Sequence, residues 1–195
     1  MSQKHDLIDE ILVKELKMFL TVPVRQKAAC QEDPESFRIM RSSQFMVWSE
    51  EAVRSYLGDL KEAEKKGRNL MTDKYARMDN LIPMLKENSL IDKIVEIECA
   101  WHKEILEKYP NAMGGARPAS SSQDTPSVTS FETYLRGELE TYSDRTLSLL
   151  YKDVKEKWET GNNRAMDISR HIVEQLGYDS LEDAEITAKK RAERA

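Results

Sequence analysis

The sequence LIDEIL at residues 7–12 returns as LIDKIV at residues 90–95, and this repetition decides the fold. The two stretches lie 83 residues apart, and the same offset places Glu15 on Glu98. Self-similarity over such a distance is the signature of a chain built from repeated structural units. The sequence therefore predicts two tandem copies of one unit.

Further along the chain, similar residues recur at a larger offset of 94. The matched pairs are Phe37 and Phe131, Trp48 and Tyr142, Ser49 and Ser143, Asp59 and Asp153, and Gly67 and Gly161. The larger offset indicates an insertion in the connector of the second copy. A connector as long as residues 108–130 is uncommon in a compact domain, so we expect it to be a lid or a disordered segment.

Each copy carries apolar residues three and four positions apart, which is the period of an amphipathic α-helix. The pattern is clearest at Val53, Tyr56, Leu57 and Leu60 in the first copy and at Leu147, Leu150, Tyr151 and Val154 in the second. Serine residues precede both stretches as N-caps and glycine residues follow them as stops. No stretch shows the alternation that is typical of a β-strand.

These patterns predict an all-α fold in which two tandem helical repeats pack about a pseudo-two-fold axis as one helical bundle domain, residues 1–195. Repeat one covers about residues 5–83 and repeat two about residues 88–178. Gly177 ends a helix, and Ser180 caps a C-terminal helix over about residues 180–194.

The composition excludes several classes of protein. A net charge of −5 disfavours nucleic acid as a partner, because a nucleic-acid reader shows a dense basic face. No apolar run is long enough for a membrane span or a signal peptide, which predicts a cytoplasmic protein without a membrane partner. Cys30 and Cys99 are expected to be free thiols in such a reducing compartment. We expect a monomer or a homodimer.

Several ionisable residues fall on apolar helix faces, where an unpaired charge would cost several kcal/mol. Glu15 and Glu98 lie among the apolar residues of the first helix of each copy. Arg41 and Gln44 share a face with Phe37, Phe45 and Trp48, and Glu138 takes the place of Gln44 in the second copy. The two copies therefore match in shape but differ in polarity.

This polar set predicts a site between the repeats for a small polar or aromatic molecule. Arg41 would anchor an anionic group, Gln44 would orient it, and Trp48, Tyr134 and Tyr142 would form the walls. Arg136, beside Gly137, would face an anion in the shared cleft. Glu138 or Glu98 would accept a proton if the protein is an enzyme, because a carboxyl group in an apolar pocket has a raised pKa.

Three alternatives stay open at this point. The inward charges are a structural network in which Arg41 neutralises Glu15, Glu98 or Glu138 and fixes the pairing of the units. Glu98 and His102, one helical turn apart, belong to the metal site of a helical-bundle enzyme. The protein is a non-enzymatic interaction or regulatory protein with an exposed apolar patch. No motif identifies a cofactor or a reaction.

Several longer strings are specific enough to suggest a family: CQEDP at 30–34, FRIMR at 37–41, SQF at 43–45, GRNL at 67–70, KYARM at 74–78 and SFETYLRGEL at 130–139. With them the chain resembles a bacterial family of domains of unknown function, number 4125 in that series, over nearly its whole length. The resemblance implies a bacterial, cytoplasmic protein without added domains. It implies no activity, cofactor or catalytic residue.

Overall fold

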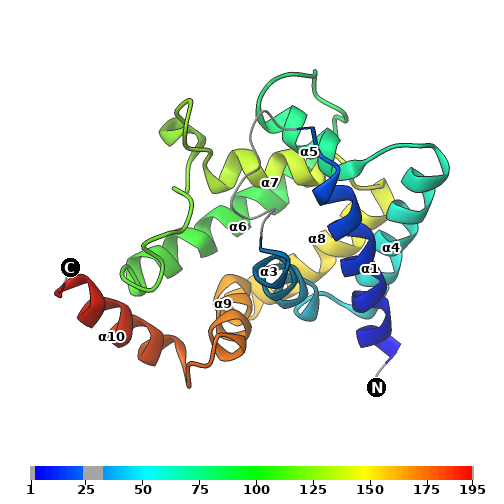
Figure 1. The fold of residues 1–195 in the computed structure, drawn as a ribbon. Helices are drawn as coiled ribbons and strands as arrows, with labels where there is room; N and C mark the ends of the chain where they lie inside the picture. Colours follow the sequence, from blue (N-terminus) through cyan, green and yellow to red (C-terminus); the bar gives the residue numbers. More distant parts are fainter. Residues whose placement is uncertain (1–2, 24–32, 195) are drawn as a thin grey trace.

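The computed structural model describes residues 3–23 and 33–194, and within these residues the regular elements are helices (Figure 1). They are α1 (Gln3–Leu20), α3 (Pro34–Met46), α4 (Glu50–Lys65), α5 (Leu70–Met78), α6 (Ser89–Lys108), the 3₁₀ turn η1 (Ser121–Gln123), α7 (Phe131–Leu139), α8 (Asp144–Glu159), α9 (Arg164–Gln175) and α10 (Leu181–Ala192). Strand-like pairing in this part of the chain is limited to one isolated bridge between Thr125 and Val128. The predicted all-α class is confirmed. Cys30 lies outside the described residues, and Cys99 is a free thiol.

The predicted helix ends are found in the structure. The Ser49 side chain accepts a hydrogen bond from the Ala52 amide at the start of α4, and Ser143 caps α8 in the same way. Gly67 and Gly161, after α4 and α8, have φ angles of 67° and 70°, a backbone conformation that glycine adopts without steric cost. Local sequence chemistry therefore determines where these helices begin and end.

The helices form two groups that pack against each other. In one group α1 contacts α3, α4 and α5, and in the other α6 contacts α7, α8 and α9. The groups meet where α4 packs on α8, α3 on α9 and α5 on α7. One large apolar core runs through both groups, and a smaller one lies around Ile105, Tyr109 and Leu181. Helix α10 packs on α9 and lies at the far edge from α1 (Figure 1).

The connector between α6 and α7 follows a defined path. The Phe131 amide donates to the Pro118 carbonyl at 2.7 Å, and Arg117 Nη1 donates to the Thr129 carbonyl at 2.8 Å. His102 Nε2 lies 2.9 Å from the Arg117 carbonyl. The connector was expected to be a lid or a disordered segment, and these contacts show that it is not disordered. Along the described chain, none of the helices has both the length and the apolar character that crossing a membrane requires.

Helices α5 and α7 are in close contact at Gly137. A Cβ atom at this position would lie 3.0 Å from Met78 Cγ and 3.1 Å from the Lys74 carbonyl oxygen. We therefore expect Gly137→Ala to lower the free energy of unfolding by about 1–3 kcal/mol, the usual cost of overpacking, in urea denaturation. A Cβ atom added at Gly58, in α4, would meet no neighbouring atom within 4 Å, so Gly58→Ala is the matched control. It should raise the free energy of unfolding by roughly 0.5–1 kcal/mol, and an equal loss in both variants would contradict the steric explanation.

Candidate functional site

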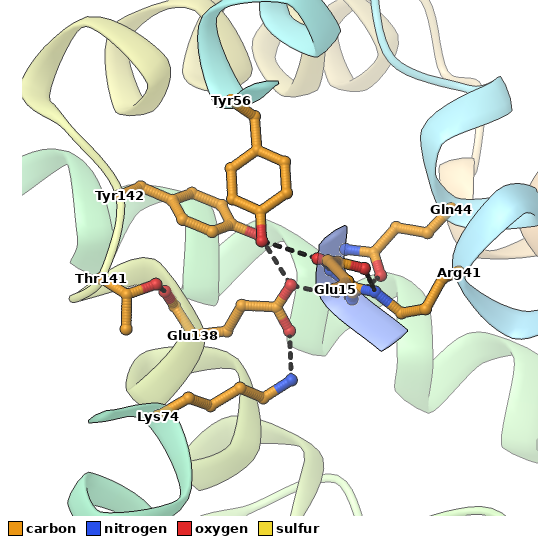
Figure 2. Close-up of polar contacts among 8 residues, drawn as sticks. All are labelled: Glu15, Arg41, Gln44, Tyr56, Lys74, Glu138, Thr141 and Tyr142. Atoms are coloured by element: carbon orange, nitrogen blue, oxygen red, sulfur yellow. Dashed lines mark hydrogen bonds and ion pairs between the residues drawn. The ribbon is translucent and has the colours of Figure 1, made fainter. Parts of the chain in front are cut away.

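Seven polar side chains meet in the interior where the two groups of helices join (Figure 2). We call this set the buried polar cluster: Glu15, Arg41, Gln44, Tyr56, Lys74, Glu138 and Tyr142. Helices α1, α3, α4 and α5 supply the first five residues, whereas Glu138 comes from α7 and Tyr142 from the turn before α8. The cluster thus joins parts of the chain that the sequence assigns to different repeats.

Arg41 lies at the centre of the cluster and contacts carboxylates from both groups. Its Nε and Nη2 donate to the two oxygens of Glu15 at 2.8 and 2.6 Å, a bidentate pair. Its Nη1 lies 2.9 Å from Glu138 Oε1 and donates to Gln44 Oε1 at 2.6 Å. Of the three carboxylates expected as its partners, Arg41 therefore pairs with Glu15 and Glu138 and not with Glu98.

Glu138 has a second cation on its other oxygen. Lys74 Nζ donates to Glu138 Oε2 at 2.6 Å, and the Tyr142 hydroxyl donates to Oε1 at 2.6 Å (Figure 2). The Tyr56 hydroxyl donates to Glu15 Oε1, also at 2.6 Å. Two cations thus face two carboxylates, and each phenol donates to a carboxylate oxygen that Arg41 also contacts.

The neighbouring charges shift the pKa values of Glu138 and Lys74 in the directions that favour their ionised forms. Burial by itself would raise the pKa of Glu138, but Arg41 and Lys74 outweigh burial and hold this pKa well below its ordinary range. Burial would lower the pKa of Lys74, yet Glu138 raises it above the ordinary value. The raised pKa expected of a proton acceptor is therefore not found at Glu138, because the carboxylate is neutralised by two cations.

The predicted aromatic walls pack on protein groups. Trp48 and Tyr142 are buried and make an edge contact with ring centroids 6.0 Å apart. Tyr134 has Lys74 Nζ at 3.6 Å from its ring centroid and the Arg117 guanidinium carbon at 4.8 Å. Cations from two elements contact this ring, as cation–π pairs do.

Glu98 occupies a separate buried position. It pairs with Arg164, the first residue of α9, and Arg164 Nε and Nη1 are buried without a hydrogen-bond partner. Burial raises the pKa of Glu98, and Arg164 only partly offsets the effect. Of the two carboxyl groups predicted to accept a proton, Glu138 and Glu98, it is therefore Glu98 whose pKa is raised as expected.

His102 and Glu98 contact different groups. Its Nε2 contacts the Arg117 carbonyl, and its ring stacks on Phe131 with centroids 4.2 Å apart. Burial lowers the pKa of His102. Among residues 3–23 and 33–194, no group of three or more His, Cys, Asp or Glu side chains is arranged to hold a metal ion.

A cleft of about 540 Å³ lies beside the α5–α7 contact. Its lining comes from the end of α5, from the turn at residues 124–129 and from one face of α7. Polar and charged residues dominate this lining: Arg77, Asp79, Asn80, Asp124, Thr125, Thr129, Thr133, Arg136 and Glu140. Of the predicted ligand-binding residues, Arg136 lies here, and no member of the buried polar cluster lines the cleft.

Sequence reasoning missed two kinds of residue. Lys74 lies on the buried face of α5 with Leu70, Met71 and Met78, so the rule that singled out Arg41 would also have found it. Arg77 and Asn80 carry no such signal, because they line one cleft with Asp124 only after the chain has folded.

Comparison with known proteins shows the family of the chain but no individual relative. No curated protein and no solved structure matched the chain. A family model described as a protein of unknown function (DUF4125) matches residues 5–186. The family resemblance of the sequence is therefore confirmed, and the chain belongs to the DUF4125 family.

Proposed function

We propose that this protein binds a small polar molecule in the cleft between α5 and α7. The observation that carries the proposal is the cleft itself, whose volume of about 540 Å³ is within the usual range for ligand sites. Its two arginines, Arg77 and Arg136, come from α5 and α7, and thus from segments assigned to different repeats. A ligand there would bridge the two units, as the sequence predicts.

The buried polar cluster supports this function indirectly. Lys74 and Gly137 lie at the same α5–α7 contact that borders the cleft. Ion pairs between Lys74 and Glu138 and between Arg77 and Glu140 hold the two helices together, the latter with Arg77 Nε 2.8 Å from Glu140 Oε2. Fixed walls favour binding because less ordering is required when the ligand arrives. Arg41, Gln44, Trp48 and Tyr142 would then support the site rather than contact the ligand.

Native mass spectrometry of the freshly purified protein tests the proposal. We expect a retained molecule that is lost or depleted in Arg136→Gln. Arg54→Gln is the matched control: Arg136 and Arg54 each pair with a glutamate four residues away, at 3.6 and 2.7 Å, but Arg54 lies on α4 away from the cleft lining. Equal amounts of the retained molecule in Arg136→Gln and Arg54→Gln would refute a site at the cleft. A wild-type spectrum with the polypeptide mass alone would also refute it, if no small polar molecule binds the protein in solution.

We also propose that the two groups of helices are copies of one unit related by a pseudo-two-fold axis. Reciprocal hydrogen bonds support it: the Ser49 amide donates to Asp153 at 2.7 Å, and the Ser143 amide donates to Asp59 at 2.9 Å. The stacked pairs Phe19–Phe37 and His102–Phe131 occupy matching positions, with centroids 5.0 and 4.2 Å apart. The proposal fails if α1, α3, α4 and α5 of an experimental structure do not superpose on α6 to α9 by a rotation of about half a turn.

The other expectations stay predictions. They are the single-domain organisation, the bacterial origin, the cytoplasmic location, the oligomeric state and the metal site at Glu98 and His102. Partner binding also stays a prediction, and the exposed apolar residues nearest to each other in the sequence are Leu81, Met84 and Leu85, between α5 and α6.

A further inference from the structure

Two guanidinium groups of the cleft are held in place by neighbouring carboxylates. Arg77 Nε donates to Glu140 Oε2 at 2.8 Å, and Arg136 Nη1 donates to Asp92 Oδ1 at 2.7 Å. Arg77 Nη1 also donates to Asn80 Oδ1 at 3.2 Å, and Arg136 Nε lies 3.6 Å from Glu132 Oε1. A guanidinium carries five N–H donors in a rigid fork, so each arginine still keeps donors beyond these contacts. Oriented guanidinium groups with remaining donors are well suited to a carboxylate ligand.

The acidic residues of the cleft are not equivalent. Asp124 accepts from the Ser130 amide and from Thr133 Oγ1, both at 2.5 Å, and so ties its turn to the start of α7. Glu140 Oε2 accepts from Arg77 and from the Leu85 amide, at 2.8 and 3.0 Å. These two carboxylates therefore stabilise the walls, which leaves Asp79 as the acidic residue best placed for a ligand.

Asp79 lies where a positive charge is favoured. It is the exposed C-cap residue of α5 and lines the cleft. The C-terminal end of a helix carries the negative end of its dipole, which adds to the attraction that the carboxylate exerts on a cation. The cleft thus combines a region for an anionic group, at the arginines, with a region for a cationic group, at the end of α5.

We propose that the ligand of this cleft is a zwitterion of the amino-acid type, with the length of a short peptide. Its carboxylate would lie against Arg77 and Arg136 and its ammonium group against Asp79. The volume of about 540 Å³ exceeds the need of a single amino acid, and Met78, Pro126 and Val128 offer apolar surface for side chains. This inference rests on the proposed function, because it names the ligand class of the same cleft.

Isothermal titration with three probes tests the ligand class. The probes are the tripeptide Ala-Ala-Ala, its N-acetyl form without the ammonium group, and its C-terminal amide without the carboxylate. We expect the free tripeptide to bind and each blocked form to bind at least about tenfold more weakly, the usual effect of losing one hydrogen bond to a charged group. Equal binding of the acetyl form would overturn the zwitterion and leave an anionic ligand.

Two variants assign the charges to residues. Arg136→Gln should weaken the free tripeptide and the acetyl form alike, whereas Asp79→Asn should weaken the free tripeptide and leave the acetyl form unchanged. Asp79 is exposed and forms none of the ion pairs of the described chain, so Asp79→Asn should fold normally. Arg54→Gln, on α4, should change neither titration.

The failure of this inference can be told apart from the failure of the proposed function. If no tripeptide form binds, but native mass spectra show another molecule that depends on Arg136, the zwitterion is overturned and the cleft remains a ligand site. If no tripeptide binds and no retained molecule depends on Arg136, both are overturned.

Discussion

Replacing Arg41 by methionine is expected to lower the free energy of unfolding by about 3–5 kcal/mol, the usual cost of removing one partner from a buried ion pair. Arg41 contacts Glu15 at 2.6 Å and Glu138 at 2.9 Å, and all three side chains are buried. The variant would leave two buried carboxylates facing one cation, Lys74. Urea denaturation measures the change.

A double variant separates lost charge balance from lost packing. Arg41→Met combined with Glu15→Leu leaves Lys74 and Glu138 as a balanced pair, at 2.6 Å. Because apolar side chains of similar volume can replace buried ion pairs at little cost, the double variant should be more stable than Arg41→Met alone. Arg54→Met, at an exposed pair, should change stability by no more than about 0.5 kcal/mol. A double variant less stable than the single one would refute the charge-balance explanation.

Replacing Glu138 by leucine should have a comparable effect, about 3–5 kcal/mol at neutral pH, with a distinctive pH dependence. Glu138 forms ion pairs with Lys74 and Arg41. The variant therefore leaves Lys74 buried with no carboxylate in contact. Burial then lowers the pKa of Lys74, because desolvation disfavours the charged form. The folded variant binds fewer protons than the unfolded chain, so its stability should rise as the pH increases toward the ordinary lysine pKa.

In the wild type, stability should not rise with pH in this way. Its folded state raises the pKa of Lys74 above the ordinary value of 10.5, so this stabilisation is fully present below that pH and is lost as the pH rises through the higher folded pKa. At the acid end, Glu138 has a lowered pKa, so its stabilisation is present above the ordinary value of 4.5 and is lost on acidification below it. Urea denaturation between about neutral pH and pH 10 compares the two proteins. A difference in stability that stays constant with pH would show that burial does not lower the pKa of Lys74 in the variant.

The sequence predicted the helices well because their signals are local. The apolar period of three and four residues, the serine caps and the glycine stops each act within a few residues, and Ser49, Ser143, Gly67 and Gly161 have the predicted roles in the structure. The excess of polar groups on apolar faces was local information too. It identified Glu15, Glu98, Arg41 and Glu138, and all four are buried.

Pairing among those charges could not be predicted, because it depends on which helices meet. Glu15 and Glu98 occupy matching positions, yet Glu15 pairs with Arg41 of α3 and Glu98 with Arg164 of α9. The residue 94 positions before Arg164 is Leu70, and the one 94 positions after Arg41 is Leu135, so each group places its arginine on a different helix. A buried carboxylate requires a cation, but several positions around it can supply one.

The sequence by itself determined the all-α class, the helix ends, the family and the burial of the polar residues, because each depends on neighbouring residues or on whole strings. Only the tertiary structure decided which groups these side chains meet: Arg41, Gln44 and Tyr142 join the buried polar cluster, whereas Arg136 lies at the cleft. Gly137 lets α5 approach α7, and the turn at residues 124–129 lines the cleft beside that contact. Contacts between residues about 50 apart in sequence follow from helix packing, which no local pattern encodes.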